Sequence, residues 1–121
     1  MENKSTEYEA KSNKWFSTEI YFGRNISAGG EISEQQFAEF LAKEVTPAFP
    51  AGMTVYDAYG QMQHSNREIV KQKTKVVVLV HKNSKADDDA INKITTAYRS
   101  KFGNPQVMLL TKQVEPVFYG D

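Results

Sequence analysis

The chain has 121 residues, 15 basic and 15 acidic side chains, and a formal net charge of +0 at pH 7. This length suits one domain with a core large enough to fold alone. Balanced charge argues against a nucleic-acid binder, which usually carries a basic excess. No apolar run is long enough to span a bilayer, and the absence of cysteine excludes disulfides and thiolate catalysis.

The chain begins with MENKSTEYEAKSNK, which has no apolar stretch after its charges and is therefore not a signal peptide as written. We expect a disordered leader over residues 1–14 and one domain over residues 15–121. The sequence as written predicts a cytoplasmic protein. A processed or trimmed N-terminus would instead fit an exported one.

The segment KWFSTEIYFGR, residues 14–24, alternates as a β-strand does. One face of the predicted strand carries Phe16, Thr18, Ile20 and Phe22. The other face carries Trp15, Ser17, Glu19 and Tyr21.

A capped helix is predicted after the loop NISAGG. Ser33 can accept a hydrogen bond as N-cap, and Gln36 three residues later completes a capping box. The apolar stripe of this helix is Phe37, Phe40, Leu41 and Val45. Pro47 ends it, because proline lacks the backbone N–H that a helix interior needs.

Residues 53–81 are predicted to form a long β-hairpin that reverses at His64-Ser65-Asn66-Arg67. Its second arm ends in KVVVLVH, residues 75–81, whose continuous apolar character suits a central strand. A four-residue reversal pairs Tyr56 with Lys75 and Asp57 with Thr74. It thereby places Tyr56 on the same face as Lys75, Val77, Leu79 and His81.

A second helix begins near Asp87, Asp88 and Asp89, whose charges favour a helix N-terminus. Its apolar stripe is Ile91, Ile94, Tyr98 and Phe102. Gly103 ends it, and residues 106–119 supply a final strand.

The predicted order is β-α-β-β-α-β. This is the order of the ferredoxin-like α+β fold, a four-stranded antiparallel sheet with two helices on one face.

Four segments of the sequence resemble an uncharacterised bacterial family, a domain of unknown function. The motifs of that family are W-x-x-T-E-[LI]-Y-F-G, E-V-T-P-x-F-P and D-A-x-G-Q. The four segments are WFSTEIYFGR (15–24), EVTPAFPAGMTV (44–55), DAYGQ (57–61) and KVVVLVH (75–81). The resemblance extends from about Trp15 to Phe118. It implies no activity, and it implies that some relatives carry export signals.

A ferredoxin-like sheet leaves one face uncovered by helices, and we expect a candidate site there. Its predicted residues are Glu19, Tyr21, Tyr56, Lys75 and His81. Glu19 as a base, with Tyr21 or Lys75 polarising an oxygen, is suited to proton abstraction beside a carbonyl. The same groups also suit cross-strand pairs and the rim of an interface, because no nucleophile–base pair is evident.

Two weaker candidates carry positive charge. Lys71, Lys73 and Lys75 form a stripe that suits an anionic ligand or the protection of a strand edge. The glycine loop after Arg24 suits a phosphate or a flexible connection. His64 and His81 lack the paired spacing of a helical metal motif, so no metal or cofactor is expected.

The sequence therefore favours a non-enzymatic, homo-oligomeric domain that binds a small or anionic ligand, or a partner, on the uncovered sheet face. A small cofactor-independent enzyme of the dimeric α/β-barrel type, acting by proton abstraction or as a monooxygenase, is the first alternative. A pure assembly module is the second. Neither nucleic acid nor a membrane is expected as a partner.

Overall fold

The computed structural model describes residues 14–120, so the expected leader lies, apart from Lys14, outside the described residues. The elements follow the predicted β-α-β-β-α-β order. They are β1 (Trp15–Gly23), α2 (Glu34–Phe40) continued by the π-helical turn η1 (Leu41–Val45), β2 (Thr54–Gln63), β3 (Ile69–Lys82), α3 (Lys85–Lys101) and β4 (Val107–Val114).

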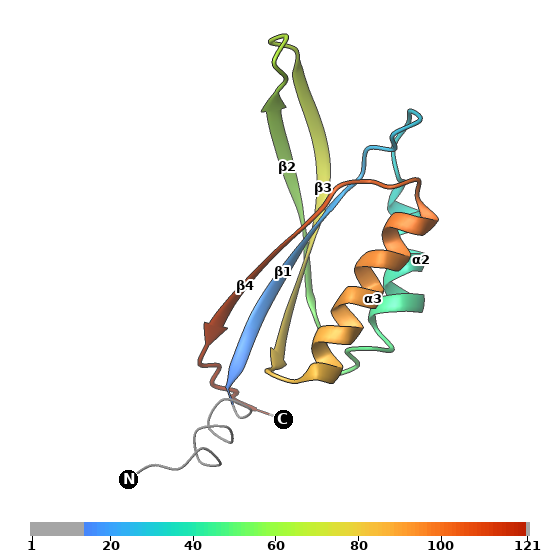
Figure 1. Ribbon diagram of the computed structural model, residues 1–121. Helices are drawn as coiled ribbons and strands as arrows, with labels where there is room; N and C mark the ends of the chain where they lie inside the picture. The colour runs from blue at the N-terminus through green and yellow to red at the C-terminus, as the bar shows by residue number, and fades with distance from the viewer. Residues whose placement is uncertain (1–13, 121) are drawn as a thin grey trace.

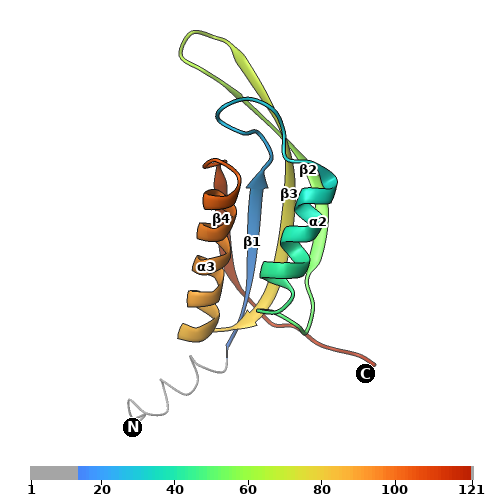
Figure 2. The same cartoon turned by 90° about the vertical axis from the view of Figure 1, so that its right-hand side faces the viewer.

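The four strands form one antiparallel sheet in the order β2-β3-β1-β4, which confirms the ferredoxin-like arrangement. Both helices lie on one side of the sheet, and the β2–β3 hairpin projects beyond them (Figure 1). In the view from the helix side, the sheet lies behind α2 and α3 (Figure 2). We call the helix-covered side the helix face and the other side the open face. No helix among the described residues is long and apolar enough to cross a membrane.

The first helix begins as its sequence predicts. The Ser33 Oγ accepts a hydrogen bond from the Gln36 N–H, and the Gln36 side chain accepts one from the Ser33 N–H. Phe37 and Phe40 are buried against the sheet. The helix widens into η1, where the Thr46 N–H donates to the Leu41 carbonyl, and it ends before Pro47.

Helix α3 begins two residues before the predicted aspartates, because Ser84 is its N-cap and accepts from the Asp87 N–H. The predicted stripe is confirmed, since Ile91, Ile94, Tyr98 and Phe102 are all buried. Its C-terminal end turns through Gly103, whose φ of 73° lies in the left-handed region that favours glycine.

An aromatic cluster joins both helices to β1. The Phe22 ring centroid lies 4.6 Å from that of Tyr98, 5.5 Å from Phe37 and 5.8 Å from Phe40. The Tyr98 hydroxyl donates a 2.8 Å hydrogen bond to the Gly23 carbonyl, and burial raises the pKa of Tyr98. The hydroxyl therefore stays protonated and ties α3 to the end of β1.

The pairing predicted for the hairpin is wrong by one residue. Tyr56 pairs with Val76 and Asp57 with Lys75, because the reversal contains five residues, 64–68. Glu68 is the additional residue, and Arg67 before it adopts a left-handed φ of 71°. The Arg67 N–H donates to the His64 carbonyl, and the His64 N–H donates to the Glu68 carbonyl.

This register decides which side chains share a face. Lys75, Val77, Leu79 and His81 all lie on the helix face and are buried there. Their predicted place beside Tyr56 is therefore wrong. Tyr56 does lie on the open face, together with Glu19 and Tyr21 as predicted.

Candidate ligand-binding site on the open face

Three of the five predicted site residues meet on the open face. The Tyr21 hydroxyl donates a 3.0 Å hydrogen bond to Glu19 Oε2, and the Tyr56 hydroxyl donates a 3.3 Å bond to the same oxygen. Glu19 and Tyr21 share a face because they are two residues apart on β1. Tyr56 reaches them from the edge strand β2, across the intervening strand β3.

Val76 forms the floor of this arrangement. It pairs with Tyr21 on one side and with Tyr56 on the other, so all three side chains point to the open face. Val76 is nevertheless 0% exposed. The two tyrosines therefore cover it, and their rings are held beside the Glu19 carboxylate. We call Glu19, Tyr21 and Tyr56 the open-face triad.

The carboxylate affects the ionisation of its neighbour. The hydrogen bond to Glu19 is the main cause that raises the pKa of Tyr21 above its usual 10.0, and partial desolvation adds to it. A tyrosinate beside a carboxylate would lose the hydrogen bond and gain repulsion. The Tyr21 hydroxyl is therefore kept as a donor at neutral pH.

Two shallow hollows lie on either side of the triad. One has a volume of about 390 Å³ and is lined by Trp15, Ala51, Gly52, Met53, Thr54, Val78, Val80 and Phe118. Phe118 packs edge-on against Trp15 with 5.8 Å between ring centroids. The other hollow has a volume of about 160 Å³ and is lined by Tyr21, Gly23, Gly60, Gln72, Thr74, Gln106 and Met108. The triad thus lies between two partly apolar depressions.

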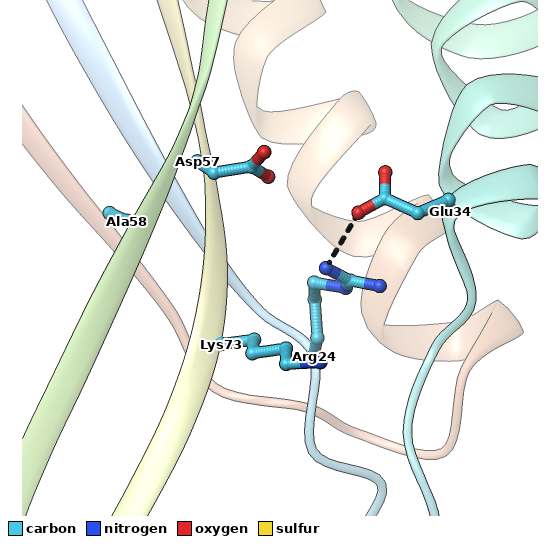
Figure 3. Close-up of a pocket in the computed structure, with 5 residues that line it drawn as sticks. All are labelled: Arg24, Glu34, Asp57, Ala58 and Lys73. Carbon is cyan, nitrogen blue, oxygen red and sulfur yellow. Dashed lines mark hydrogen bonds and ion pairs between the residues drawn. The ribbon is translucent and has the colours of Figure 1, made fainter.

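Lys75 belongs to an ionic network on the helix face. Its Nζ lies 2.6 Å from Glu34 Oε2 and 2.6 Å from Asp57 Oδ1, and its side chain is 10% exposed. Arg24 contacts the other Glu34 oxygen at 3.1 Å and donates from Nε to the Ile32 carbonyl. Figure 3 shows Glu34 and Asp57 pointing toward each other from α2 and β2, with Arg24 beneath Glu34. The network fastens the projecting hairpin to the start of α2.

Opposite charges also shift the pKa values in this network. Hydrogen bonds to Lys75 lower the pKa of Glu34 and of Asp57. Burial by itself would lower the pKa of Lys75, but the hydrogen bonds with Asp57 and Glu34 prevail and raise it. All three groups are therefore charged over the whole neutral range.

Two lysines of the predicted stripe are paired with carboxylates, because Lys73 also contacts Glu31 at 3.4 Å. A hollow of about 270 Å³ lies among Arg24, Glu34, Asp57, Ala58 and Lys73. Its cations already face carboxylates, so it has no excess positive charge for an anion. The predicted register placed Lys75 on the open face and therefore did not pair it with Asp57, although strand alternation puts Asp57 on the face opposite to Tyr56, toward the helices.

The His81 side chain also lies on the helix face, where both ring nitrogens have hydrogen-bond partners. Its Nε2 lies 2.7 Å from the Thr18 hydroxyl and its Nδ1 lies 2.9 Å from the Lys82 carbonyl. Since a carbonyl only accepts, Nδ1 carries a proton. The Thr18 hydroxyl also lies 3.1 Å from that of Thr111. His81 therefore ties β3, β1 and β4 together beneath α3, away from the triad.

No group of three or more metal-ligating side chains is placed to hold an ion within residues 14–120. The open-face triad offers one carboxylate and two phenols. It can accept hydrogen bonds, attract a cation or take up a proton.

Comparison with known proteins identifies the family. A family described as "Protein of unknown function (DUF3574)" matches residues 17–118, so the chain belongs to it, as its sequence motifs predicted. No curated protein matches the chain in sequence.

Solved structures share the fold at low sequence identity. A phage SAM lyase in complex with S-methyl-5'-thioadenosine has a TM-score of 0.64 and 13% identity, covering 84% of this chain and 82% of that chain. The apo phage SAM lyase gives 0.62 and 14%, covering 81% and 79%. The de novo designed protein Foldit4 gives 0.51 and 11%, covering 84% and 100%. At these identities the likeness shows the fold alone.

The ionic network predicts a pH dependence of stability. Because Asp57 and Glu34 have lowered pKa values, their contribution is present above their ordinary values of 3.8 and 4.5 and is lost as pH falls through the lowered values. We expect Lys75→Met to lower the urea midpoint at pH 7 and to flatten its decline in acid. Urea denaturation over a pH series measures this. Lys93→Met, which removes an exposed lysine of α3 outside this network, is the control, and parallel acid profiles for wild type and Lys75→Met would contradict the assignment.

The triad predicts a change in tyrosine ionisation. We expect Glu19→Gln to lower the pKa of Tyr21 toward its usual 10.0, because the acceptor that favours the protonated phenol loses its charge. NMR titration of chains with ¹³C-labelled tyrosine measures this. Asp57→Asn removes a carboxylate from the other face and should leave the Tyr21 titration unchanged. An unaltered Tyr21 titration in Glu19→Gln would show that the bond does not form in solution.

Proposed function

We propose that the chain is a non-enzymatic ligand-binding domain that works as a homo-oligomer, with a small ligand held at the open-face triad. The observation that carries the proposal is the convergence of two tyrosine hydroxyls on one carboxylate oxygen within a largely apolar sheet face. Ligand sites typically combine an apolar lining with a few oriented polar groups. The two flanking hollows supply that lining.

The exposed apolar side chains around the triad support the proposed oligomer. Val80, Met108 and Leu110 lie on the open face and are 42%, 46% and 48% exposed. Such apolar side chains on adjacent strands favour burial against another sheet. A bound small molecule also buries most of its surface, which the shallow hollows of one chain do not provide. A second copy packed against this face would both cover the apolar rim and enclose the ligand.

An enzymatic function is the second candidate, because the phage SAM lyase shares the fold and has been solved with S-methyl-5'-thioadenosine. Glu19 is placed to take up a proton from a substrate, with Tyr21 as its hydrogen-bonded neighbour. Lys75 takes no part in this alternative, because it lies on the helix face in its pairs with Glu34 and Asp57.

Leu110→Asp tests the oligomer. We expect light scattering after size exclusion to show an oligomer for the wild type and a monomer for this variant, since a charge in the covered face would be desolvated. Tyr59→Asp introduces the same charge at an exposed position on the helix side of β2 and should keep the oligomer. A wild-type chain that is strictly monomeric would refute the oligomeric part of the proposal.

Incubation with S-adenosylmethionine separates the two candidates. We expect the wild-type chain to leave it unchanged, with no S-methyl-5'-thioadenosine above a protein-free blank in chromatography. Formation of that product by the wild type and by Asp57→Asn, with its loss in Glu19→Gln, would instead establish the lyase alternative. Product formed equally by Glu19→Gln would place any such activity outside the triad.

A further inference from the structure

The strands place one carboxylate and two lysines on the open face. Among the strand residues that the register places on this face, Glu19 is the one carboxylate. Lys112 lies on β4 two residues from Leu110, the partner of Glu19, and is therefore a diagonal neighbour of Glu19. Lys82 lies at the end of β3, paired with Trp15, and its Nζ is 4.6 Å from the Trp15 ring centroid. No salt bridge to Glu19 forms within residues 14–120.

Glu19 also keeps acceptor capacity for a ligand. Both tyrosine hydroxyls donate to Oε2, and Oε1 has no hydrogen-bond partner among the described residues. A carboxylate has about four lone-pair sites, so a ligand can approach without displacing either tyrosine. The two hydroxyls fix the direction in which the free oxygen points.

The surroundings favour a cation of a particular kind. The tyrosine rings that cover Val76 present π-systems beside the carboxylate, and such rings attract weakly hydrated organic cations. The hollow lined by Trp15, Val80 and Phe118 can accept an apolar or aromatic arm. A small metal ion would find only one carboxylate, and an anion would meet its repulsion.

We infer that the open-face triad binds an organic cation, of the quaternary ammonium or sulfonium class, whose apolar arm lies in the hollow beside Trp15 and Phe118. The inference rests on the proposed function and names the ligand chemistry for the same site. It also replaces the anionic ligand that the lysine stripe had indicated. Lys73 and Lys75 face the helix side and already contact carboxylates, so they supply no anion site on the open face.

Choline and 3,3-dimethyl-1-butanol form a matched pair of probes, since they differ in a charged nitrogen and a neutral carbon of the same shape. We expect choline, titrated into the ¹⁵N-labelled wild-type chain, to shift the amide signals around Glu19, Tyr21 and Tyr56. The neutral alcohol should bind at least about tenfold more weakly. Benzyltrimethylammonium should bind several-fold tighter than choline, because its ring enters the apolar hollow.

Three variants assign the effect to the triad. Glu19→Gln should weaken choline binding about tenfold. Tyr56→Leu, which removes a ring and keeps the carboxylate, should weaken it about threefold. Asp57→Asn, the neighbouring carboxylate on the helix face, should bind choline as the wild type does. Dispersed amide spectra confirm that each variant is folded.

The remaining outcomes overturn the inference in distinguishable ways. Equal binding of the neutral alcohol, or stronger shifts of open-face signals with inorganic phosphate, would refute the cationic class and leave the open face as a ligand site. Choline binding that Asp57→Asn abolishes and Glu19→Gln spares would move the site to the helix face. If no probe shifts the open-face signals, both the inference and the proposed ligand site fail.

Discussion

The pairing of β3 with its two neighbours is the constraint on which the rest of the structure depends. β3 pairs with β2 on one side and with β1 on the other, so its alternation determines what both faces of the sheet contain. Val77 and Leu79 point to the helices and are fully buried in the core. A slip of one residue would exchange them with Val76 and Val78 and would turn Lys75 and His81 to the open face.

Strand β2 contributes one residue to each of two polar groups, the ionic network on the helix face and the open-face triad, because its side chains alternate between the two faces. Asp57 points toward α2 and binds Lys75, while Tyr56, one residue earlier, points to the open face and binds Glu19. The network of Lys75 with Asp57 and Glu34 fastens an edge strand that has only one strand neighbour.

The two polar groups differ in what they leave available. On the helix face, cations and carboxylates neutralise each other and a buried lysine lies between them. On the open face, a carboxylate is held by neutral hydroxyl groups, which orient it without cancelling its charge. The first arrangement holds two elements of the fold together, whereas the second leaves an oriented carboxylate beside apolar surface.

The sequence by itself determined where the helices and strands form, because capping and apolar periodicity depend on residues that are close together in the chain. The capping box of Ser33 and Gln36, the stripe of α3 and the alternation of β1 each depend on residues a few positions apart. The order of elements then limited the fold to the ferredoxin-like arrangement, and Glu19, Tyr21 and Tyr56 were correctly expected on one face. The family named from the resemblance is the one whose model matches residues 17–118.

Only the tertiary structure decided where Lys75 and His81 lie. Their faces depend on the length of the reversal at residues 64–68, where Arg67 adopts a left-handed conformation that its residue type does not predict. Because strand alternation has a period of two, one additional residue in the turn moves every later side chain to the other face. Lys75 could be assigned to Glu34 and Asp57 only once α2, β2 and β3 were placed together in space.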